Sequence, residues 1–195
     1  MNLRTGRLNL PNILTLARIA AVPVVLVLLL SDSRSSGVWA AAIFGIAAAT
    51  DFIDGWLARK WGVVTILGKF LDPLADKLIV MVALIMLIPL DRVPAWAVFL
   101  ILAREMVVTG LRSIASSEGI VIDASDLGKY KTIYQMVAIP GLMLHYDFNW
   151  FFGLEWGIFQ VNMHNFGIFF FYILIFFYII VIAYHHPIYI TNMNR

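Results

Sequence analysis

Six apolar stretches of about 20 residues each dominate this sequence and limit the folds that the chain can adopt. A helix that crosses the hydrocarbon core of a bilayer needs about 20 mainly apolar residues. Hydrophobic residues make up 62% of the chain and charged residues 13%, which differs from the composition of a soluble domain. We therefore expect an all-α integral membrane protein, built as a bundle of six transmembrane helices. The stretches are residues 12–30, 38–59, 68–90, 94–113, 127–146 and 165–184.

The remaining composition limits the domain organisation and the partners. With no long polar linker, the chain leaves little room for a separate soluble domain, so we expect residues 1–195 to form a single membrane-embedded domain. Residues 1–10 place leucines beside arginines and suit a short juxtamembrane segment along the headgroups. The net charge of +2 is too small to indicate nucleic acid as a partner. Without cysteine, the chain has no disulfides and no thiolate metal ligands.

The distribution of basic residues orients the predicted bundle. Twelve of the 14 lysines and arginines lie near one end of the predicted spans. The two exceptions are Arg34 and Arg92. Cytoplasmic segments of membrane proteins are enriched in lysine and arginine. We therefore expect both chain termini to face the cytoplasm.

Four carboxylates interrupt the apolar pattern around the junction of the second and third stretches. They lie in DFIDGWLARKWGVVTILGKFLDPLADK and are Asp51, Asp54, Asp72 and Asp76. The first two are three residues apart and the last two are four apart, so each pair shares one helix face. The segment between the pairs contains Gly62 and can reverse direction, so that the two helices pack antiparallel with their acidic faces together. Acidic residues at membrane depth are costly and indicate a functional site.

Such an acidic cluster needs positive charge, because converging carboxylates repel each other unless a cation neutralises them. Oxygen ligands favour Mg²⁺ or Mn²⁺, and four shared carboxylates suffice for the two ions used in phosphoryl-transfer chemistry. Zinc is disfavoured, since the histidines lie far from the cluster in the sequence. The sequence therefore predicts a two-metal site that faces the cytoplasm.

The spacing of these residues resembles a known motif. The motif consists of D-x-x-D-G-x-x-A-R, then eight residues, then G-x-x-x-D-x-x-x-D. The chain has the required residue at each fixed position: Asp51, Asp54, Gly55, Ala58, Arg59, Gly68, Asp72 and Asp76. In this respect the chain resembles the CDP-alcohol phosphatidyltransferase family. PNILTLAR, AREMVVTGLRSIASSEG and LGKYKTIYQMVA are similar to segments of the bacterial phosphatidylglycerophosphate synthases within that family.

The resemblance implies a reaction and a location. The phosphatidyl group of CDP-diacylglycerol would pass to sn-glycerol 3-phosphate, giving phosphatidylglycerophosphate and CMP for phosphatidylglycerol and cardiolipin synthesis. It also implies two Mg²⁺ or Mn²⁺ ions as cofactors and a homodimer in the bacterial cytoplasmic (inner) membrane.

The resemblance further implies roles for individual residues. Asp51, Asp54, Asp72 and Asp76 would hold the metal ions, and Asp76 would also act as the general base toward the acceptor hydroxyl. Residues that would bind CDP-diacylglycerol are Asn12, Thr15, Gly55, Ala58, Arg59 and Gly68.

Three basic residues suit the acceptor, whose phosphate needs fixed positive charge. Arg112, Lys129 and Lys131 occupy basic positions of the similar segments, toward the cytoplasmic ends of the fourth and fifth stretches. We expect them to bind glycerol 3-phosphate, and the alternative is that they anchor the helices at the headgroups.

Three other charged residues interrupt apolar stretches without a clear assignment. Arg18 lies in the first stretch, where it can reach the headgroups or a phosphate. Arg104 and Glu105 are sequence neighbours in the fourth stretch and do not share a helix face. Helix locking and a role in the site are both compatible with these two residues.

Two alternative functions stay open from the sequence. A sibling phosphatidyltransferase would use another alcohol, such as serine or inositol phosphate, because few residues decide the choice of acceptor. A cation-coupled transporter would also carry acids within membrane helices, but it would distribute them toward the far side. The acids near that side lie in predicted loops and are Asp32, Asp91, Asp147 and Glu155.

Overall fold

The computed structural model describes residues 10–61, 66–117, 126–145 and 163–193, and these residues form six α-helices and no strand. The helices are α1 (Leu10–Leu29), α2 (Arg34–Trp61), α3 (Ile66–Leu87), α4 (Ala95–Ser117), α5 (Asp126–Leu144) and α6 (Met163–Met193). The predicted all-α fold is confirmed, and each helix overlaps one predicted stretch. By length and hydropathy taken together, no helix in the described ranges qualifies as a membrane span. The six transmembrane spans stay a prediction.

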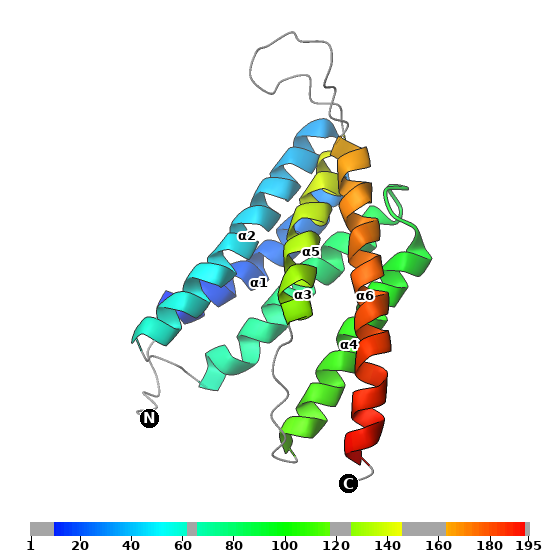
Figure 1. The fold of residues 1–195 in the computed structure, drawn as a ribbon. Helices are drawn as coiled ribbons and strands as arrows, with labels where there is room; N and C mark the ends of the chain where they lie inside the picture. Colours follow the sequence, from blue (N-terminus) through cyan, green and yellow to red (C-terminus); the bar gives the residue numbers. More distant parts are fainter. Residues whose placement is uncertain (1–9, 62–65, 118–125, 146–162, 194–195) are drawn as a thin grey trace.

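The helices run alternately in opposite directions, so that their ends gather at two ends of the molecule (Figure 1). One end contains the start of α1, the end of α2, the start of α3, the end of α4, the start of α5 and the end of α6. We call it the acid end, because the acid-bearing segments of α2 and α3 lie toward it. The opposite end is called the far end.

The first helix connects the two acid-bearing helices. α2 and α3 run antiparallel, as predicted (Figure 1). Their contacts with each other are sparse, however, whereas α1 packs extensively against both of them. The acid-bearing helices are therefore held together mainly through α1, which the sequence did not predict.

Local sequence signals explain several helix ends. The Ser33 hydroxyl oxygen accepts a hydrogen bond from the Ser36 backbone N–H at 3.2 Å, which caps the start of α2. Pro11 lies in the first turn of α1, where its missing N–H costs little. Asp91 adopts a φ of 54° in the turn between α3 and α4, a conformation that aspartate tolerates better than most residues.

An apolar core runs between the helices, and every helix contributes to it. Its largest fully buried side chains include Leu29 of α1, Phe44 of α2, Leu84 of α3, Ile101 of α4, Leu142 of α5 and Phe171 of α6. Closely packed side chains of this size make many van der Waals contacts, whose attractions add up to a substantial stabilisation. The core therefore fixes the helices that carry the candidate site.

A buried arginine holds the far end together. Arg92, which follows α3, donates hydrogen bonds through Nη1 to the backbone oxygens of Leu142 at 3.2 Å and Met143 at 2.8 Å. Its Nη2 donates to Oδ1 of Asp32, between α1 and α2, at 2.5 Å. These contacts satisfy carbonyls at the C-terminus of α5 that have no partner within the helix. Arg92 therefore joins three parts of the chain.

Two histidines connect the end of α5 with the start of α6. The Nδ1 atoms of His145 and His164 are 3.1 Å apart, so one ring nitrogen donates a hydrogen bond and the other accepts it. Partial burial lowers the pKa of His164, and the nearby charges of His145 and Arg92 lower it further. The neutral form of His164 is therefore favoured near pH 7.

The fifth and sixth helices approach closely at two glycines. A Cβ atom added to Gly167 would lie 2.6 Å from the backbone nitrogen of Leu142 and 2.8 Å from the carbonyl carbon of Gly141. A Cβ atom added to Gly141 would lie 3.0 Å from the Cα atom of Gly167. Small residues let helix backbones pack this closely. The α5–α6 crossing therefore has no room for a side chain at Gly167.

Candidate functional site

The predicted metal-binding and substrate-binding residues all belong to helices, on the parts that lie toward the acid end (Figure 1). α1 carries Asn12 and Thr15; α2 carries Asp51, Asp54, Gly55, Ala58 and Arg59; α3 carries Gly68, Asp72 and Asp76; α4 carries Arg112; and α5 carries Lys129 and Lys131. Of these side chains, the structure describes Thr15, Asp76 and Lys131. The other candidates lie outside the described side chains, and their predicted contacts stay predictions.

The predicted metal site falls mostly outside the described side chains. Asp51, Asp54 and Asp72 are not among them, and only Asp76 is. Within the set that the structure does describe, no three histidine or acidic residues are grouped so that they could hold a metal ion. The two-metal site therefore stays a prediction that rests on the four carboxylates and their spacing.

Asp76 is held in place by an arginine from another helix. Nη1 of Arg18 in α1 donates a hydrogen bond to Oδ1 of Asp76 in α3, at 2.7 Å. The Arg18 side chain is 1% exposed, whereas that of Asp76 is 38% exposed. A guanidinium inside the bundle thus fixes a carboxylate that stays accessible to a substrate or a cation. Accessibility and an anionic oxygen donor are what a metal ligand or a general base needs.

The sequence did not predict the partner of Arg18. The sequence left contact with the headgroups or with a phosphate open for Arg18, and the described structure places its guanidinium against Asp76. Thr15 precedes Arg18 by three residues on the same face of α1 and is buried. This face of α1 therefore points into the bundle, which is consistent with the packing of α1 against α3.

Four side chains from three helices form a second group, which we call the cationic cluster. Its members are Arg104 and Glu105 of α4, Lys131 of α5 and Tyr178 of α6. Oε1 of Glu105 accepts a hydrogen bond from the Tyr178 hydroxyl at 2.5 Å and forms an ion pair with the Lys131 ammonium. Nη1 of Arg104 lies 3.5 Å from the same oxygen. Glu105 is thus the common partner of the other three residues.

The aromatic ring of Tyr178 completes the cationic cluster. The guanidinium carbon of Arg104 lies 4.8 Å from the ring centroid, and Nζ of Lys131 lies 5.3 Å from it. Cations at such distances are attracted to the face of an aromatic ring. Two cationic side chains share one carboxylate, so the cluster has an excess of one formal positive charge. It can therefore attract an anion.

A short relay of hydrogen bonds connects the cationic cluster with α3. Nζ of Lys77 donates to the hydroxyl oxygen of Thr109 at 2.7 Å, and this hydroxyl donates to the backbone oxygen of Glu105, also at 2.7 Å. Lys77 follows Asp76 in the sequence. Thr109 lies four residues after Glu105, which is about 6 Å along the helix axis. The residue of α4 one turn beyond Glu105 therefore contacts the residue of α3 that follows Asp76 in the sequence.

The sequence indicated some members of this cluster and missed another. Lys131 was predicted to bind the acceptor, and Arg104 with Glu105 was compatible with helix locking or with a role in the site. The described contacts show that Glu105 connects α4 with α5 and α6. Tyr178 was missed, because it lies within the run FFFYILIFFYII and nothing in that run distinguishes one tyrosine.

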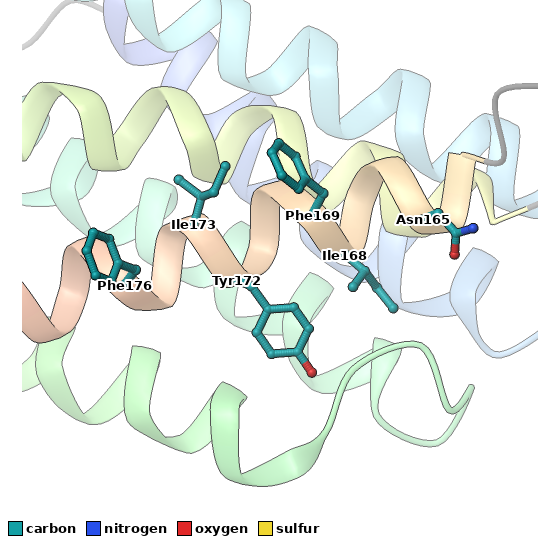
Figure 2. Close-up of a pocket in the computed structure, with 6 residues that line it drawn as sticks. All are labelled: Asn165, Ile168, Phe169, Tyr172, Ile173 and Phe176. Carbon is teal, nitrogen blue, oxygen red and sulfur yellow. The ribbon is translucent and has the colours of Figure 1, made fainter. Parts of the chain in front are cut away.

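An open hollow on α6 lies apart from the candidate residues (Figure 2). It is lined by Asn165, Ile168, Phe169, Tyr172, Ile173 and Phe176, and its lining is almost entirely apolar. Figure 2 shows Phe169 and Tyr172 pointing to different sides of the helix. The hollow contains none of the predicted site residues and belongs to the apolar exterior of the molecule.

Comparison with known proteins gives one family and several relatives. A sequence model of the family described as CDP-alcohol phosphatidyltransferase matches residues 8–184. The chain is 47% identical over 149 residues to the CDP-diacylglycerol–glycerol-3-phosphate 3-phosphatidyltransferase of Bacillus subtilis (strain 168), with 70% of this chain and 77% of the relative covered. The protein of the same name from Rickettsia bellii (strain RML369-C) is 45% identical over 136 residues, with 70% and 75% covered.

A third relative comes from Mycobacterium tuberculosis (strain ATCC 25618 / H37Rv) and is named as a probable phosphatidylglycerophosphate synthase. It is 48% identical over 134 residues, with 67% of this chain and 64% of the relative covered.

Proposed function

Because this chain belongs to the CDP-alcohol phosphatidyltransferase family, we propose that it transfers the phosphatidyl group of CDP-diacylglycerol to sn-glycerol 3-phosphate. The products are phosphatidylglycerophosphate and CMP. The family assignment made from the spacing of the acidic motif is confirmed. The observation that carries the choice of reaction is the 47% identity over 149 residues to a relative named for this transfer.

The cationic cluster supports a phosphorylated acceptor. A phosphate dianion is best held by fixed cations and charge-assisted hydrogen bonds. Arg104 and Lys131 provide two cations, and the helix that carries Arg104 contacts α3 at Lys77, next to Asp76 in the sequence. Serine has no phosphate to use them, whereas inositol phosphate does. The names of the relatives favour glycerol 3-phosphate over inositol phosphate, and a transferase over a transporter.

The acid end has the groups that the reaction needs. Asp76, fixed by Arg18, takes the proton from the attacking hydroxyl of the acceptor. Asp51, Asp54, Asp72 and Asp76 would hold two Mg²⁺ or Mn²⁺ ions, whose charge would offset that of the pyrophosphate and of the departing CMP. The residues that bind CDP-diacylglycerol in this proposal are Asn12, Thr15, Gly55, Ala58, Arg59 and Gly68.

A location in the bilayer is part of the proposal. Large apolar side chains are exposed on the outside of the helices, among them Phe99 at 69%, Ile46 at 67% and Phe176 at 61%. Extended apolar exteriors of this kind suit contact with lipid. We place residues 1–195 in the bacterial cytoplasmic (inner) membrane as a single multi-pass domain, with the acid end at the cytoplasmic surface. Family likeness supports a homodimer.

An acceptor assay tests the proposed reaction. Purified protein in detergent should release CMP from CDP-diacylglycerol only when glycerol 3-phosphate and Mg²⁺ or Mn²⁺ are both present, because the acceptor attacks an activated phosphate at carboxylates that need cations. Removal of the metal with EDTA should stop the reaction, and re-addition should restore it. Equal turnover with serine or inositol phosphate in place of glycerol 3-phosphate would contradict the proposed acceptor.

Replacement of Lys131 by alanine tests the acceptor site. The variant should raise KM for glycerol 3-phosphate by about tenfold or more, since a hydrogen bond to a charged group is lost. KM for CDP-diacylglycerol should stay near the wild-type value. Arg34→Ala is a suitable control, because Arg34 is an exposed basic residue at the far end. If Lys131→Ala and Arg34→Ala changed KM for glycerol 3-phosphate and KM for CDP-diacylglycerol equally, Lys131 would be an anchor at the headgroups and not an acceptor residue.

A further inference from the structure

Glu105 has no role in the reaction described above, yet it contacts the predicted acceptor residue Lys131 directly. We propose that Glu105 is a positioning residue, which holds the Lys131 ammonium where the phosphate of the acceptor binds. Tyr178 and Arg104 hold the Glu105 carboxylate in turn. This inference rests on the proposed function and assigns to its acceptor site a residue that does not itself contact the substrate.

A lysine side chain is flexible unless its ammonium is held in place. Four rotatable bonds let an ammonium occupy many places, and fixing it costs conformational entropy when a substrate binds. Here the ion pair with Glu105 fixes the Lys131 ammonium before any substrate arrives. The Lys131 side chain is only 15% exposed, and that of Glu105 is 20% exposed, so solvent competes weakly for this pair. A preorganised cation binds phosphate more tightly than a mobile one.

The cationic cluster keeps a net positive charge although it contains Glu105. Glu105 alone would repel a phosphate, but two cations surround its carboxylate. An ammonium has three donor hydrogens and a guanidinium has five, which is more than one carboxylate can accept. The carboxylate can therefore orient Lys131 and Arg104 while the cluster still attracts an anion.

Glu105 lies on the part of α4 that contacts α3. The relay through Thr109 and Lys77 places Glu105 one helical turn from a contact with the segment of α3 that carries Asp76. Arg112 follows Glu105 by seven residues, which is two turns along the same side of α4. Glu105 and Arg112 thus share one side of α4, with Arg112 nearer the acid end.

Glu105→Gln tests this inference by separating the two substrates. The amide keeps the size of the side chain but loses the charge that holds the Lys131 ammonium. We expect KM for glycerol 3-phosphate to rise by about tenfold or more, with KM for CDP-diacylglycerol unchanged. Glu105→Asp keeps the charge on a shorter side chain and should restore part of the affinity for glycerol 3-phosphate.

Asp32→Asn is the matched control. Asp32 pairs with buried Arg92 at the far end, so its replacement also removes one carboxylate from an ion pair with a buried cation. It should lower the thermal stability in detergent without changing either KM. If Glu105→Gln also lowers stability and leaves KM for glycerol 3-phosphate at the wild-type value, Glu105 only joins the helices and the inference is wrong.

A milder variant covers the case in which Glu105→Gln does not fold. Tyr178→Phe keeps the ring against the two cations and removes the hydroxyl that donates to Glu105. It should raise KM for glycerol 3-phosphate by a smaller factor, and an unchanged KM would overturn the inference. The wild-type protein separates the two proposals. If it does not use glycerol 3-phosphate, the proposed function fails. If it does, but KM for glycerol 3-phosphate is unchanged in the Glu105 and Tyr178 variants, only the role of Glu105 is contradicted.

Discussion

Asp76→Asn is expected to lower the turnover of CDP-diacylglycerol and glycerol 3-phosphate by about a thousandfold. Asparagine has nearly the same shape as aspartate, but its amide neither accepts a proton from the acceptor hydroxyl nor provides an anionic ligand. The effect should appear in the rate of CMP release at saturating concentrations of both substrates, because the chemical step itself is impaired.

The same variant should stay folded. The amide oxygen of asparagine can still accept the hydrogen bond from Nη1 of Arg18, and the carboxylate that it replaces is partly exposed. Asp76→Asn should therefore lower the thermal stability in detergent no more than Asp32→Asn, which weakens the ion pair of buried Arg92 at the far end. Turnover close to the wild-type rate in folded Asp76→Asn would show that Asp76 is not the base.

Gly167→Ala is expected to destabilise the protein by about 3 kcal/mol. The new methyl group would lie 2.6 Å from the Leu142 nitrogen and 2.8 Å from the Gly141 carbonyl carbon. Both contacts are with backbone, so rotation of a side chain cannot relieve them. Separation of α5 from α6 would relieve them, but it would also open the core between these helices. Denaturant or thermal unfolding in detergent would measure the loss.

Gly45→Ala is the matched control for this prediction. Gly45 is also a helical glycine, in α2, and a Cβ atom built there meets nothing within 4 Å. Alanine favours the helix over glycine by about 0.5–1 kcal/mol, so this variant should be as stable as the wild type or slightly more stable. If Gly167→Ala and Gly45→Ala had the same stability, the close α5–α6 crossing would be wrong.

Much of the fold could be predicted from the sequence, because apolar periodicity and length are local signals. The six apolar stretches correspond to α1 through α6, with ends that differ by a few residues in most cases. The exception is α6, which continues to Met193, although the apolar run ends near Tyr184. Polarity alone does not end a helix when the backbone can continue its hydrogen bonds.

The family could also be predicted, because the acidic motif has fixed residues at fixed spacing. The partners of those residues could not. Arg18 and Asp76 are 58 residues apart and meet only because α1 packs against α3. Glu105 and Tyr178 are 73 residues apart, and nothing in the apolar run around Tyr178 indicates that its hydroxyl has a polar partner. Contacts between distant segments depend on tertiary packing, about which spacing within one helix gives no information.

The short connection between α2 and α3 has a consequence for how the site can fail. Trp61 and Ile66 are five residues apart, so the chain lets the facing ends of these helices separate by at most about 18 Å. This tether and the packing of α1 against both helices therefore hold the aspartate-bearing segments of α2 and α3 in one part of the bundle. The cationic cluster has no such tether, since it draws on α4, α5 and α6. Partial melting of those three helices would thus remove the predicted acceptor site while α2 and α3 stayed joined through α1.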